Sequence, residues 1–390
     1  MEQQLAPLRI GMVVGEASGD ILGASLIKQL KKQYGNIEFE GIGGPLMIAE
    51  GFNSHYQMDR LSVMGIVEPL KRLPELISMR SGIIRHFKNT PPDLFLGIDA
   101  PDFNLTIELK LREAGIKTAH YVSPSIWAWR QKRVFKVKKA VDMMLTLLPF
   151  EADFYRRFEI PVTFVGHPLA DQLPMQPDTS GARARLSLDD SARVLCLMPG
   201  SRGSEIKHLG PLFLQVALRI QQQIPALKLV LPTANAARKE QLIAIIDGLD
   251  EAEKQRINEM LLLLDGDSHT AMEASDAVLL ASGTTALEAM LLKKPMVVSY
   301  RLGKYSYALF SRMIKLDYFS LPNLLANKML VPEAIQDDAN VENLTQLTLQ
   351  RLDGSMDVDI LAAEFTDYHQ QLKQQASEKA ATALLALIEG

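Results

Sequence analysis

The sequence predicts an α/β protein with two doubly wound domains and a helical C-terminal tail. Short apolar runs alternate with longer amphipathic segments, which is typical of parallel sheets covered by helices on both faces. The chain has 390 residues, whereas a single core usually stops growing at about 250–300 residues, so two domains are expected. A stretch rich in proline, aspartate and serine, residues 171–192, marks the boundary between them.

The first domain is expected to span residues 1–175. A helix is predicted at residues 21–32, because its apolar residues recur with a helical period. The apolar runs that predict strands are residues 8–14, 39–42, 94–98, 118–122, 143–148 and 163–165.

The second domain is expected to span residues 190–340, followed by the helical tail at residues 341–390. Its predicted helices are residues 212–224 and 284–292, and its predicted strands are residues 194–198, 227–231, 261–264, 277–280 and 296–300. Two Rossmann-like domains of this kind are expected to face a central cleft at the carboxyl ends of their strands, where ligands usually bind.

Composition and charge narrow the class of protein. The net charge is −4, which disfavours a nucleic-acid-binding protein, because such proteins present a strong basic field. Cys196 is the single cysteine and lies in an apolar run, so a buried thiol and a reducing, cytoplasmic compartment are expected. No stretch approaches the roughly 18–20 apolar residues of a spanning helix, and the N-terminus lacks a signal-peptide pattern. We therefore expect a cytosolic or peripheral protein.

An aspartate follows one predicted strand at the place where ligand-binding groups gather. Residues 97–104 read GIDAPDFN, and Asp99 stands just past the end of the strand at residues 94–98. A carboxylate there can act as a general base toward an acceptor hydroxyl, and Asn104 can orient it. Asp102 precedes a helical run and suits an N-cap. Two capping aspartates in a tight turn are the structural alternative.

Both tryptophans of the chain lie in a basic segment, residues 121–139. Tryptophan suits sugar faces and membrane interfaces, and cations suit phosphates and anionic lipids. A second apolar segment with flanking cations, residues 61–73, suits a bilayer surface or an acyl pocket. The structural alternatives are core tryptophans beside a solvated basic helix, and a core helix with a basic outer face. The tryptophans and cations are Trp127, Trp129, Arg130, Lys132, Arg133, Lys136, Lys138 and Lys139.

Two small-residue turns connect predicted strands to predicted helices and suit phosphate. The turn at residues 200–204, GSRGS, adds the cation of Arg202 to the free N–H groups of a helix start. The turn at residues 282–285, SGTT, offers hydroxyls and amides, and Glu288 one helical turn later can accept hydrogen bonds from ribose. We interpret both turns together as a site for a nucleoside diphosphate, with helix capping as the alternative for the second. A third turn, residues 15–20, is a weaker signal, because it lacks both a dinucleotide motif and a cation.

The motifs together resemble the lipid-A-disaccharide synthase family. The matching stretches occur in one order over most of the chain: VVGEASGDILGA, VMGIVE, GIDAPDFN, HYVSPSIWAWRQKRVFK, LLPFE, FVGHPLAD, MPGSRGSE, LLASGTTALE and SLPNLLA. The GIDAPDFN and SPSIWAWRQKR segments are specific to the family, whereas glycine turns alone would not be.

The resemblance implies a GT-B fold and an inverting transfer of 2,3-diacylglucosamine from UDP-2,3-diacylglucosamine to 2,3-diacylglucosamine 1-phosphate. The product is a β(1→6)-linked disaccharide phosphate of lipid A (lipopolysaccharide) biosynthesis. Asp99 matches the candidate base of the family, with Asp102 as the alternative. The implied UDP-sugar residues are Gly200, Ser201, Arg202, Ser282, Gly283, Thr284, Thr285, Glu288 and Asn323. The acceptor or membrane candidates are Ser18, Met64, Asn104, Trp127, Trp129, Arg130, Lys132 and Arg133.

The resemblance also implies no cofactor and no metal, in agreement with the lack of metal-ligand spacing around His120, His167 and His208. The expected partners are the two substrates and the anionic cytoplasmic face of the inner membrane, with no nucleic acid; a homo-oligomer is left open. The alternatives are another UDP-sugar enzyme of GT-B fold, such as a UDP-GlcNAc epimerase, and a non-catalytic nucleotide-binding or membrane-binding protein.

Overall fold

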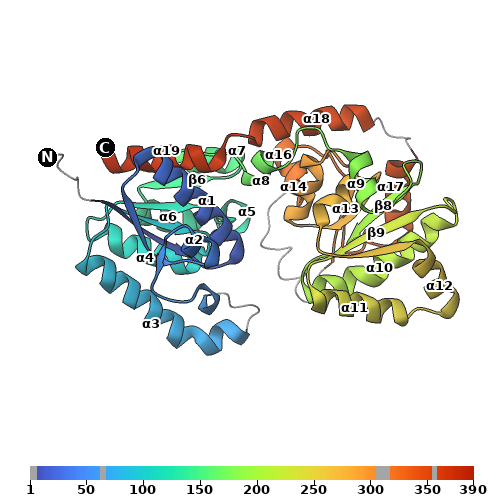
Figure 1. Ribbon diagram of the computed structural model, residues 1–390, viewed down its shortest axis with the longest axis horizontal. Coiled ribbons are helices and arrows are strands. Elements are labelled where there is room, and N and C mark those ends of the chain that lie inside the picture. Colours follow the sequence, from blue (N-terminus) through green and yellow to red (C-terminus); the bar gives the residue numbers. More distant parts are fainter. Residues whose placement is uncertain (1–6, 62–66, 302, 304–316, 354–357) are drawn as a thin grey trace. The chain divides into compact units, whose positions relative to one another are not determined.

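The computed structural model describes residues 7–61, 67–301, 303, 317–353 and 358–390, with the side chains of residues 67–71 left out. The chain forms two compact units (Figure 1): the first comprises Met1–Asp171 and Leu372–Gly390, and the second comprises Gln172–Gln371. The expected C-terminal tail, residues 341–390, is indeed helical, but it is divided between the two units.

The first unit contains a parallel sheet with strand order β3-β2-β1-β4-β5-β6-β7. Val14 of β1 pairs with Ile98 of β4, and Ile98 pairs with Tyr121 of β5. The turns that follow these three strands therefore lie at one edge of the sheet. The strands are β1 (Leu8–Val14), β2 (Ile37–Ile42), β3 (Asn53–Ser54), β4 (Leu94–Ile98), β5 (Thr118–Tyr121), β6 (Met143–Thr146) and β7 (Val162–Phe164).

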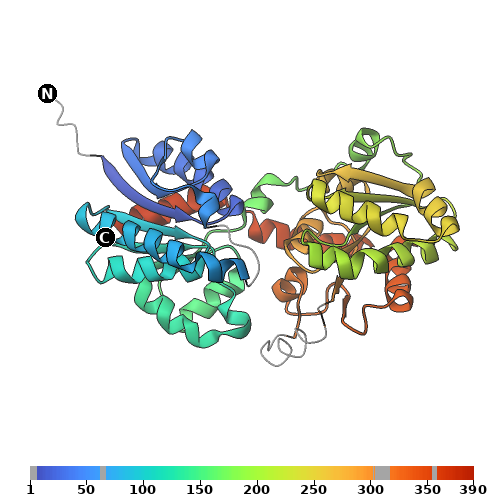
Figure 2. The same cartoon turned by 90° about the horizontal axis from the view of Figure 1, so that it is seen from below.

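Helices cover both faces of this sheet, and the C-terminal helix completes one of them. On one face α1 packs against α19, and Leu26 and Ile27 share a core with Ala380 and Leu384. On the other face lie α3 and α4 (Figures 1 and 2). Phe87 and other apolar residues are buried between these helices and the sheet. The helices are α1 (Ala17–Tyr34), α2 (Pro45–Ala49), η1 (Met58–Arg60), α3 (Val67–Asn89), α4 (Pro101–Arg112), α5 (Ile126–Trp129), η2 (Gln131–Arg133), α6 (Val134–Ala140), α7 (Pro149–Arg156), α8 (Pro168–Gln172) and α19 (Ala376–Glu389).

The second unit repeats the architecture with a parallel sheet of order β10-β9-β8-β11-β12-β13. The strands are β8 (Val194–Met198), β9 (Lys228–Thr233), β10 (Leu261–Asp265), β11 (Ala277–Ala281), β12 (Met296–Tyr300) and β13 (Glu333–Ile335). The described helices are α9 (Thr179–Arg185), α10 (Gly203–Gln221), α11 (Ala236–Asp247), α12 (Glu251–Met260), α13 (Ser268–Ala274), α14 (Thr284–Leu291), α16 (Leu321–Ala326), α17 (Val341–Leu352) and α18 (Val358–Leu372).

The observed elements confirm the alternating pattern of the sequence, with differences at the ends. Helix α10 begins at Gly203 rather than at residue 212 and continues through Pro211. The short strands β3 and β13 were not predicted. Cys196 is fully buried on β8, as expected for a thiol in an apolar strand, and burial raises the pKa of that thiol.

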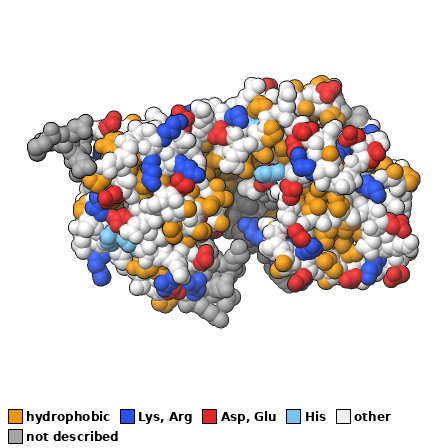
Figure 3. Space-filling model, viewed as in Figure 1, with side chains coloured by type: hydrophobic (Ala, Val, Ile, Leu, Met, Phe, Trp, Pro, Cys, Tyr) orange, Lys and Arg blue, Asp and Glu red, His pale blue; other side chains and the backbone are white. Residues whose placement is uncertain are grey.

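The surface carries both signs of charge. Acidic and basic side chains are intermixed on the face shown in Figure 3 rather than gathered into one field. Among the residues that the structure describes, no helix is both long enough and apolar enough to span a bilayer.

Candidate functional site

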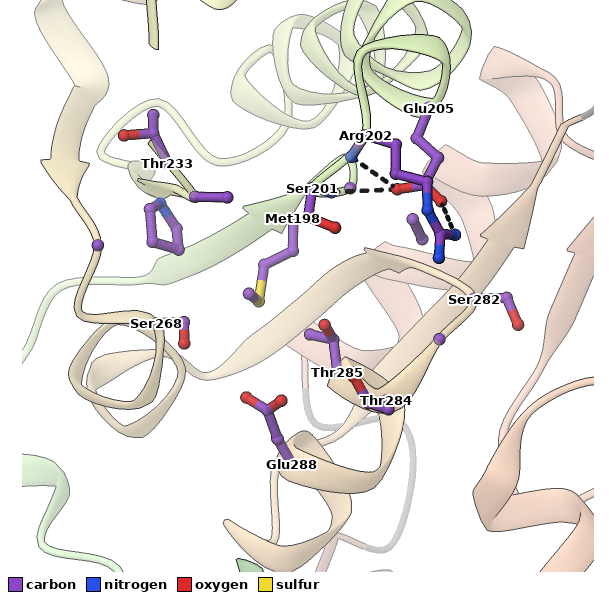
Figure 4. Close-up of a pocket in the computed structure, with 16 residues that line it drawn as sticks. Met198, Ser201, Arg202, Glu205, Thr233, Ser268, Ser282, Thr284, Thr285 and Glu288 are labelled. Atoms are coloured by element: carbon purple, nitrogen blue, oxygen red, sulfur yellow. Dashed lines mark hydrogen bonds and ion pairs between the residues drawn. The ribbon is translucent and has the colours of Figure 1, made fainter. Parts of the chain in front are cut away.

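A pocket of about 530 Å³ lies at the carboxyl edge of the second unit's sheet, where the turns after β8, β9, β10 and β11 meet (Figure 4). Eight residues predicted from the sequence line it together: Gly200, Ser201, Arg202, Ser282, Gly283, Thr284, Thr285 and Glu288. Other lining residues were not predicted from the sequence, among them Glu205, Thr233, Gly266 and Ser268. Thr233 is the last residue of β9 and Gly266 follows β10, so the edge-of-sheet rule could have found them.

The Glu205 carboxylate occupies the start of α10. Its Oε2 atom accepts hydrogen bonds from the backbone N–H groups of Ser201 and Arg202, both at 3.1 Å, and its Oε1 atom accepts one from Arg202 Nη1 at 3.0 Å. Figure 4 shows these contacts as dashed lines. Gly200 has a φ of 118°, and a Cβ atom there would lie 2.4 Å from the Glu205 carboxylate. The turn therefore requires glycine both for its backbone conformation and for the close approach of Glu205.

This arrangement corrects one expectation from the sequence. The N–H groups of Ser201 and Arg202 were predicted to face a phosphate, but Glu205 already satisfies them. At the start of α14 the N-cap residue is Gly283, which has no side chain to accept hydrogen bonds from the first N–H groups of the helix. Uncapped N–H groups at a helix start favour an anion. The start of helix α14 and the largely exposed guanidinium of Arg202 therefore offer groups that suit a phosphate.

Glu288 projects from α14 toward the middle of the pocket, beside Thr285 (Figure 4). Its Oε2 atom lies 3.1 Å from His269 Nε2 on α13. This hydrogen bond raises the pKa of His269 above its ordinary value, although partial burial of the imidazole opposes the rise. His269 was not predicted from the sequence, because its hydrogen bond to Glu288 joins two separate helices, α13 and α14. The pair holds Glu288 in place while its other oxygen stays available to a ligand.

Asn323, which the resemblance placed on the nucleotide side, is fully buried and does not line the pocket. Its Oδ1 atom accepts hydrogen bonds from the backbone N–H groups of Leu330 and Val331, at 2.7 and 2.8 Å. Its Nδ2 atom donates to the Val331 carbonyl at 2.8 Å and to the Glu333 carboxylate at 2.7 Å. Asn323 therefore ties α16 to the segment that leads into β13.

In the first unit, Asp99 lies in an unusual turn after β4. Asp99 and Ala100 have φ values of 54° and 43°, so two consecutive non-glycine residues adopt the left-handed conformation, which is unfavourable for L-residues. Gly15 makes room for this turn, because a Cβ atom at Gly15 would lie 2.9 Å from that of Ala100. The turns after β1 and β4 are thus packed together, and Ser18 is exposed in the first turn of α1 beside them.

Asn104 and Asp102 both lie on α4 but make different contacts. Asn104 is fully buried, and its Nδ2 atom donates to the backbone carbonyls of Asp99 at 2.8 Å and Val13 at 3.1 Å. Asn104 therefore orients the backbone of Asp99 rather than its carboxylate, and it is too deeply buried to touch an acceptor. The Asp102 side chain is 83% exposed and forms an ion pair with Arg133.

The basic segment has both buried and exposed members. Trp127 is half-buried and packs edge-on against Phe150, with ring centroids 4.9 Å apart. The Arg130 guanidinium lies 4.0 Å from the centroid of the Trp129 ring, a cation–π contact. Lys132 is exposed. The last acceptor candidate, Met64, and most of the apolar segment at residues 61–73 lie outside the described residues and side chains.

A buried carboxyl group lies beneath the basic segment. Burial raises the pKa of Glu151 to about 7, although the backbone N–H of Leu148 donates a hydrogen bond to its carboxylate at 3.1 Å. The folded protein thus binds this proton more tightly than the unfolded chain. The contribution of this bound proton to the free energy of unfolding is fully present below about pH 4.5, and it is lost as the pH rises toward 7.

Replacing Glu151 by glutamine is therefore expected to stabilise the protein at pH 8, by up to about 3 kcal/mol, and to change little near pH 4.5. Glutamine can still accept the Leu148 hydrogen bond and has no charge to bury. Urea unfolding at both pH values measures the effect. Asp153→Asn on the exposed side of α7 is the control. Equal pH dependence of stability in wild type and Glu151→Gln would show that Glu151 does not hold the proton.

Solved structures with low sequence identity share the fold. A glycosyltransferase from Rickettsia africae aligns with a TM-score of 0.60 and 12% identity over 99% of this chain and 98% of its own. A UDP-GlcNAc 2-epimerase from Neisseria meningitidis, bound to UDP-GlcNAc, aligns with a TM-score of 0.59 and 13% identity. The alignment covers 98% of this chain and 100% of the epimerase chain. With its two parallel-sheet units, the chain is a protein of the GT-B fold class, as predicted.

Sequence relatives identify the family within this class. The family described as Lipid-A-disaccharide synthetase matches residues 10–387. The lipid-A-disaccharide synthase of Hahella chejuensis is 54% identical over 385 residues, 98% of this chain and 95% of its own. The lipid-A-disaccharide synthase of Pseudomonas entomophila is 53% identical over 387 residues, which cover 99% of this chain and 100% of the relative. The chain belongs to the lipid-A-disaccharide synthase family and is a glycosyltransferase of lipid A biosynthesis.

Proposed function

We propose that the protein transfers 2,3-diacylglucosamine from UDP-2,3-diacylglucosamine to the 6-hydroxyl of 2,3-diacylglucosamine 1-phosphate, with inversion at the anomeric carbon. The observation that carries the donor assignment is the convergence of the Arg202 turn, the start of α14 and Glu288 on one pocket. Each supplies a different group that a UDP-sugar requires: a cation, free N–H groups and a hydrogen-bond acceptor.

In this proposal the diphosphate binds at the start of α14. The N–H groups and hydroxyls of Thr284 and Thr285 suit its oxygens, and Arg202 neutralises its charge. Glu205 holds the Arg202 side chain near the pocket before the ligand arrives. Glu288, positioned by His269, accepts hydrogen bonds from the ribose hydroxyls.

The first unit supplies the base. The Asp99 carboxylate accepts the proton of the acceptor 6-hydroxyl while that oxygen forms a bond to the anomeric carbon of the donor. The bond from this carbon to the UDP oxygen breaks, and UDP leaves with its negative charge stabilised by Arg202 and α14. A single displacement of this kind converts an α-linked donor into a β(1→6)-linked product.

Donor selection tests this assignment against the epimerase alternative. Purified protein is incubated with the acceptor phosphate and either UDP-2,3-diacylglucosamine or UDP-GlcNAc, and UDP, disaccharide and epimerised sugar are measured. We expect UDP and disaccharide only with the diacylated donor. Epimerisation of UDP-GlcNAc without disaccharide formation would contradict the proposal.

We also propose that the first unit binds the surface of anionic membranes, where both lipid substrates reside. Leu73 and Ile77, four residues apart on α3, are 47% and 45% exposed, and Phe135 on α6 is 57% exposed. Helix α4 packs against both α3 and α6, so these apolar side chains belong to one helical layer. The exposed lysines Lys132, Lys138 and Lys139 lie next to Phe135 in the sequence.

Replacing Lys132, Lys138 and Lys139 together by glutamine is expected to weaken binding to anionic vesicles by roughly 100-fold, since each cation near such a surface contributes about 1 kcal/mol. Vesicle sedimentation at rising salt measures the binding, and salt should weaken it in the wild type.

The control replaces three lysines of the second unit, Lys207, Lys228 and Lys239. If the wild type stays in the supernatant with anionic vesicles at low salt, or if both triple variants bind equally, the assigned surface is wrong.

A further inference from the structure

Three side chains of metal-ligand type converge in the first unit, whereas the nucleotide pocket lies in the second. Glu40 lies on β2, His55 follows β3 and His86 lies on α3. Glu40 Oε2 is 3.1 Å from His55 Nε2 and 2.9 Å from His86 Nε2. One ligand atom of each residue lies within 4.8 Å of those of the other two. The two imidazole rings also touch, with centroids 4.5 Å apart.

We propose that Glu40, His55 and His86 form a binding site for a divalent transition metal of the zinc type. Zinc binds imidazole nitrogen and carboxylate oxygen at about 2.0–2.2 Å in tetrahedral geometry, which places ligand atoms roughly 3.3–3.4 Å apart. The two nitrogen-to-oxygen separations here are only slightly shorter. After small side-chain rotations, a metal ion can therefore take the place of the two protons in the hydrogen bonds between the imidazoles and Glu40. Two histidines, one carboxylate and a water form a common donor set for zinc.

The residues around Glu40 orient its carboxylate toward the two imidazoles. The Glu40 carboxylate lies within hydrogen-bond distance of Arg9 and of both imidazoles. Arg9 binds Oε1, which leaves Oε2 to the imidazoles and fixes the orientation of the carboxylate. The side chains of His55 and His86 are partly exposed, so water can reach a fourth coordination position.

The chemistry of the donor set selects the kind of metal. Magnesium and calcium prefer oxygen ligands, whereas two imidazole nitrogens favour zinc, cobalt, nickel or copper. The positive charge of Arg9 disfavours the binding of any cation. Binding therefore depends on the partly covalent bonds between the metal and the imidazole nitrogens. The bound metal joins β2, the segment after β3 and α3. No metal was expected from the sequence. The three ligands come from separate elements and form no short motif.

Titration with Co²⁺ tests the site, because tetrahedral cobalt has a characteristic visible absorption. The full-length protein, without an affinity tag and treated with chelator, is titrated with Co²⁺, and Zn²⁺ is then added as competitor. We expect one equivalent to bind with a micromolar or lower Kd. His55→Gln and His86→Gln should each weaken binding at least tenfold. His208→Gln, which changes an exposed histidine on α10, should bind like the wild type.

Thermal unfolding gives a second readout that does not depend on activity. Zinc should raise the Tm of the wild type and of His208→Gln, because it binds only the folded site, and should raise the Tm of His86→Gln less, because the affinity of that variant is lower. Circular dichroism confirms that each variant is folded. Absence of stoichiometric binding by the wild type, or equal binding by wild type and both ligand variants, would overturn the proposal.

Discussion

Replacing Asp99 by asparagine is expected to lower the rate of disaccharide formation by roughly 10²–10⁴-fold, the usual contribution of a positioned general base. Asparagine keeps the size of the side chain and removes its basicity. In the described part of the chain no residue hydrogen-bonds the Asp99 carboxylate, so it is available to accept a proton. Steady-state release of UDP measures the rate. UDP affinity should stay near the wild-type value, because the proposed UDP site lies in the second unit.

Asp102→Asn is the matched control for this experiment, because it makes the same chemical change three residues away. Asp102 is exposed and its structural contact is the ion pair with Arg133. Exposed ion pairs contribute little to stability, so we expect at most a small effect on turnover. A wild-type rate in Asp99→Asn together with loss of activity in Asp102→Asn would exchange the two roles.

Replacing Arg202 by alanine is expected to weaken UDP binding roughly 10- to 150-fold. A hydrogen bond to a charged group typically contributes about 1.5–3 kcal/mol, and each 1.4 kcal/mol is a factor of ten. In the wild type the guanidinium lies beside Glu205 and is 75% exposed, so it can turn toward a phosphate at small cost. Calorimetric titration with UDP measures the change.

Arg219→Ala is the control, because Arg219 lies on the same helix, α10, and is exposed outside the pocket. It should bind UDP like the wild type. The loss in Arg202→Ala should shrink when uridine replaces UDP, because uridine has no phosphate. Equal UDP affinity of wild type and Arg202→Ala would refute the assignment of Arg202 to the diphosphate.

The strands were predictable because each inner strand is buried on both faces and appears as a short apolar run. Residues 94–98, for example, are all buried on β4. The strands β3 (Asn53–Ser54) and β13 (Glu333–Ile335) are short and contain polar residues, so they leave no apolar run. Helix α10 begins earlier than predicted because the Glu205 carboxylate binds the backbone N–H of its N-cap residue, Arg202, and because its apolar pattern is strongest after residue 212.

The candidate site was predictable as far as local sequence determines it. Small residues after β8 and β11 indicate turns, and parallel strands bring such turns to one edge, so the Arg202 turn and the start of α14 meet. The contact between His269 and Glu288 depends on the packing of two helices and leaves no local pattern. Asn323 matched a family motif, but motif position does not determine the direction of a side chain, and its amide binds the segment between α16 and β13.

The structure of the reaction product tests the central claim most directly. Purified protein is incubated with UDP-2,3-diacylglucosamine and 2,3-diacylglucosamine 1-phosphate, and the product is examined by mass spectrometry and by NMR of its anomeric protons. We predict one UDP released per disaccharide 1-phosphate and a β(1→6) linkage, as a single displacement with one base requires. An α-linked disaccharide, or hydrolysis of the donor without disaccharide, would contradict the account.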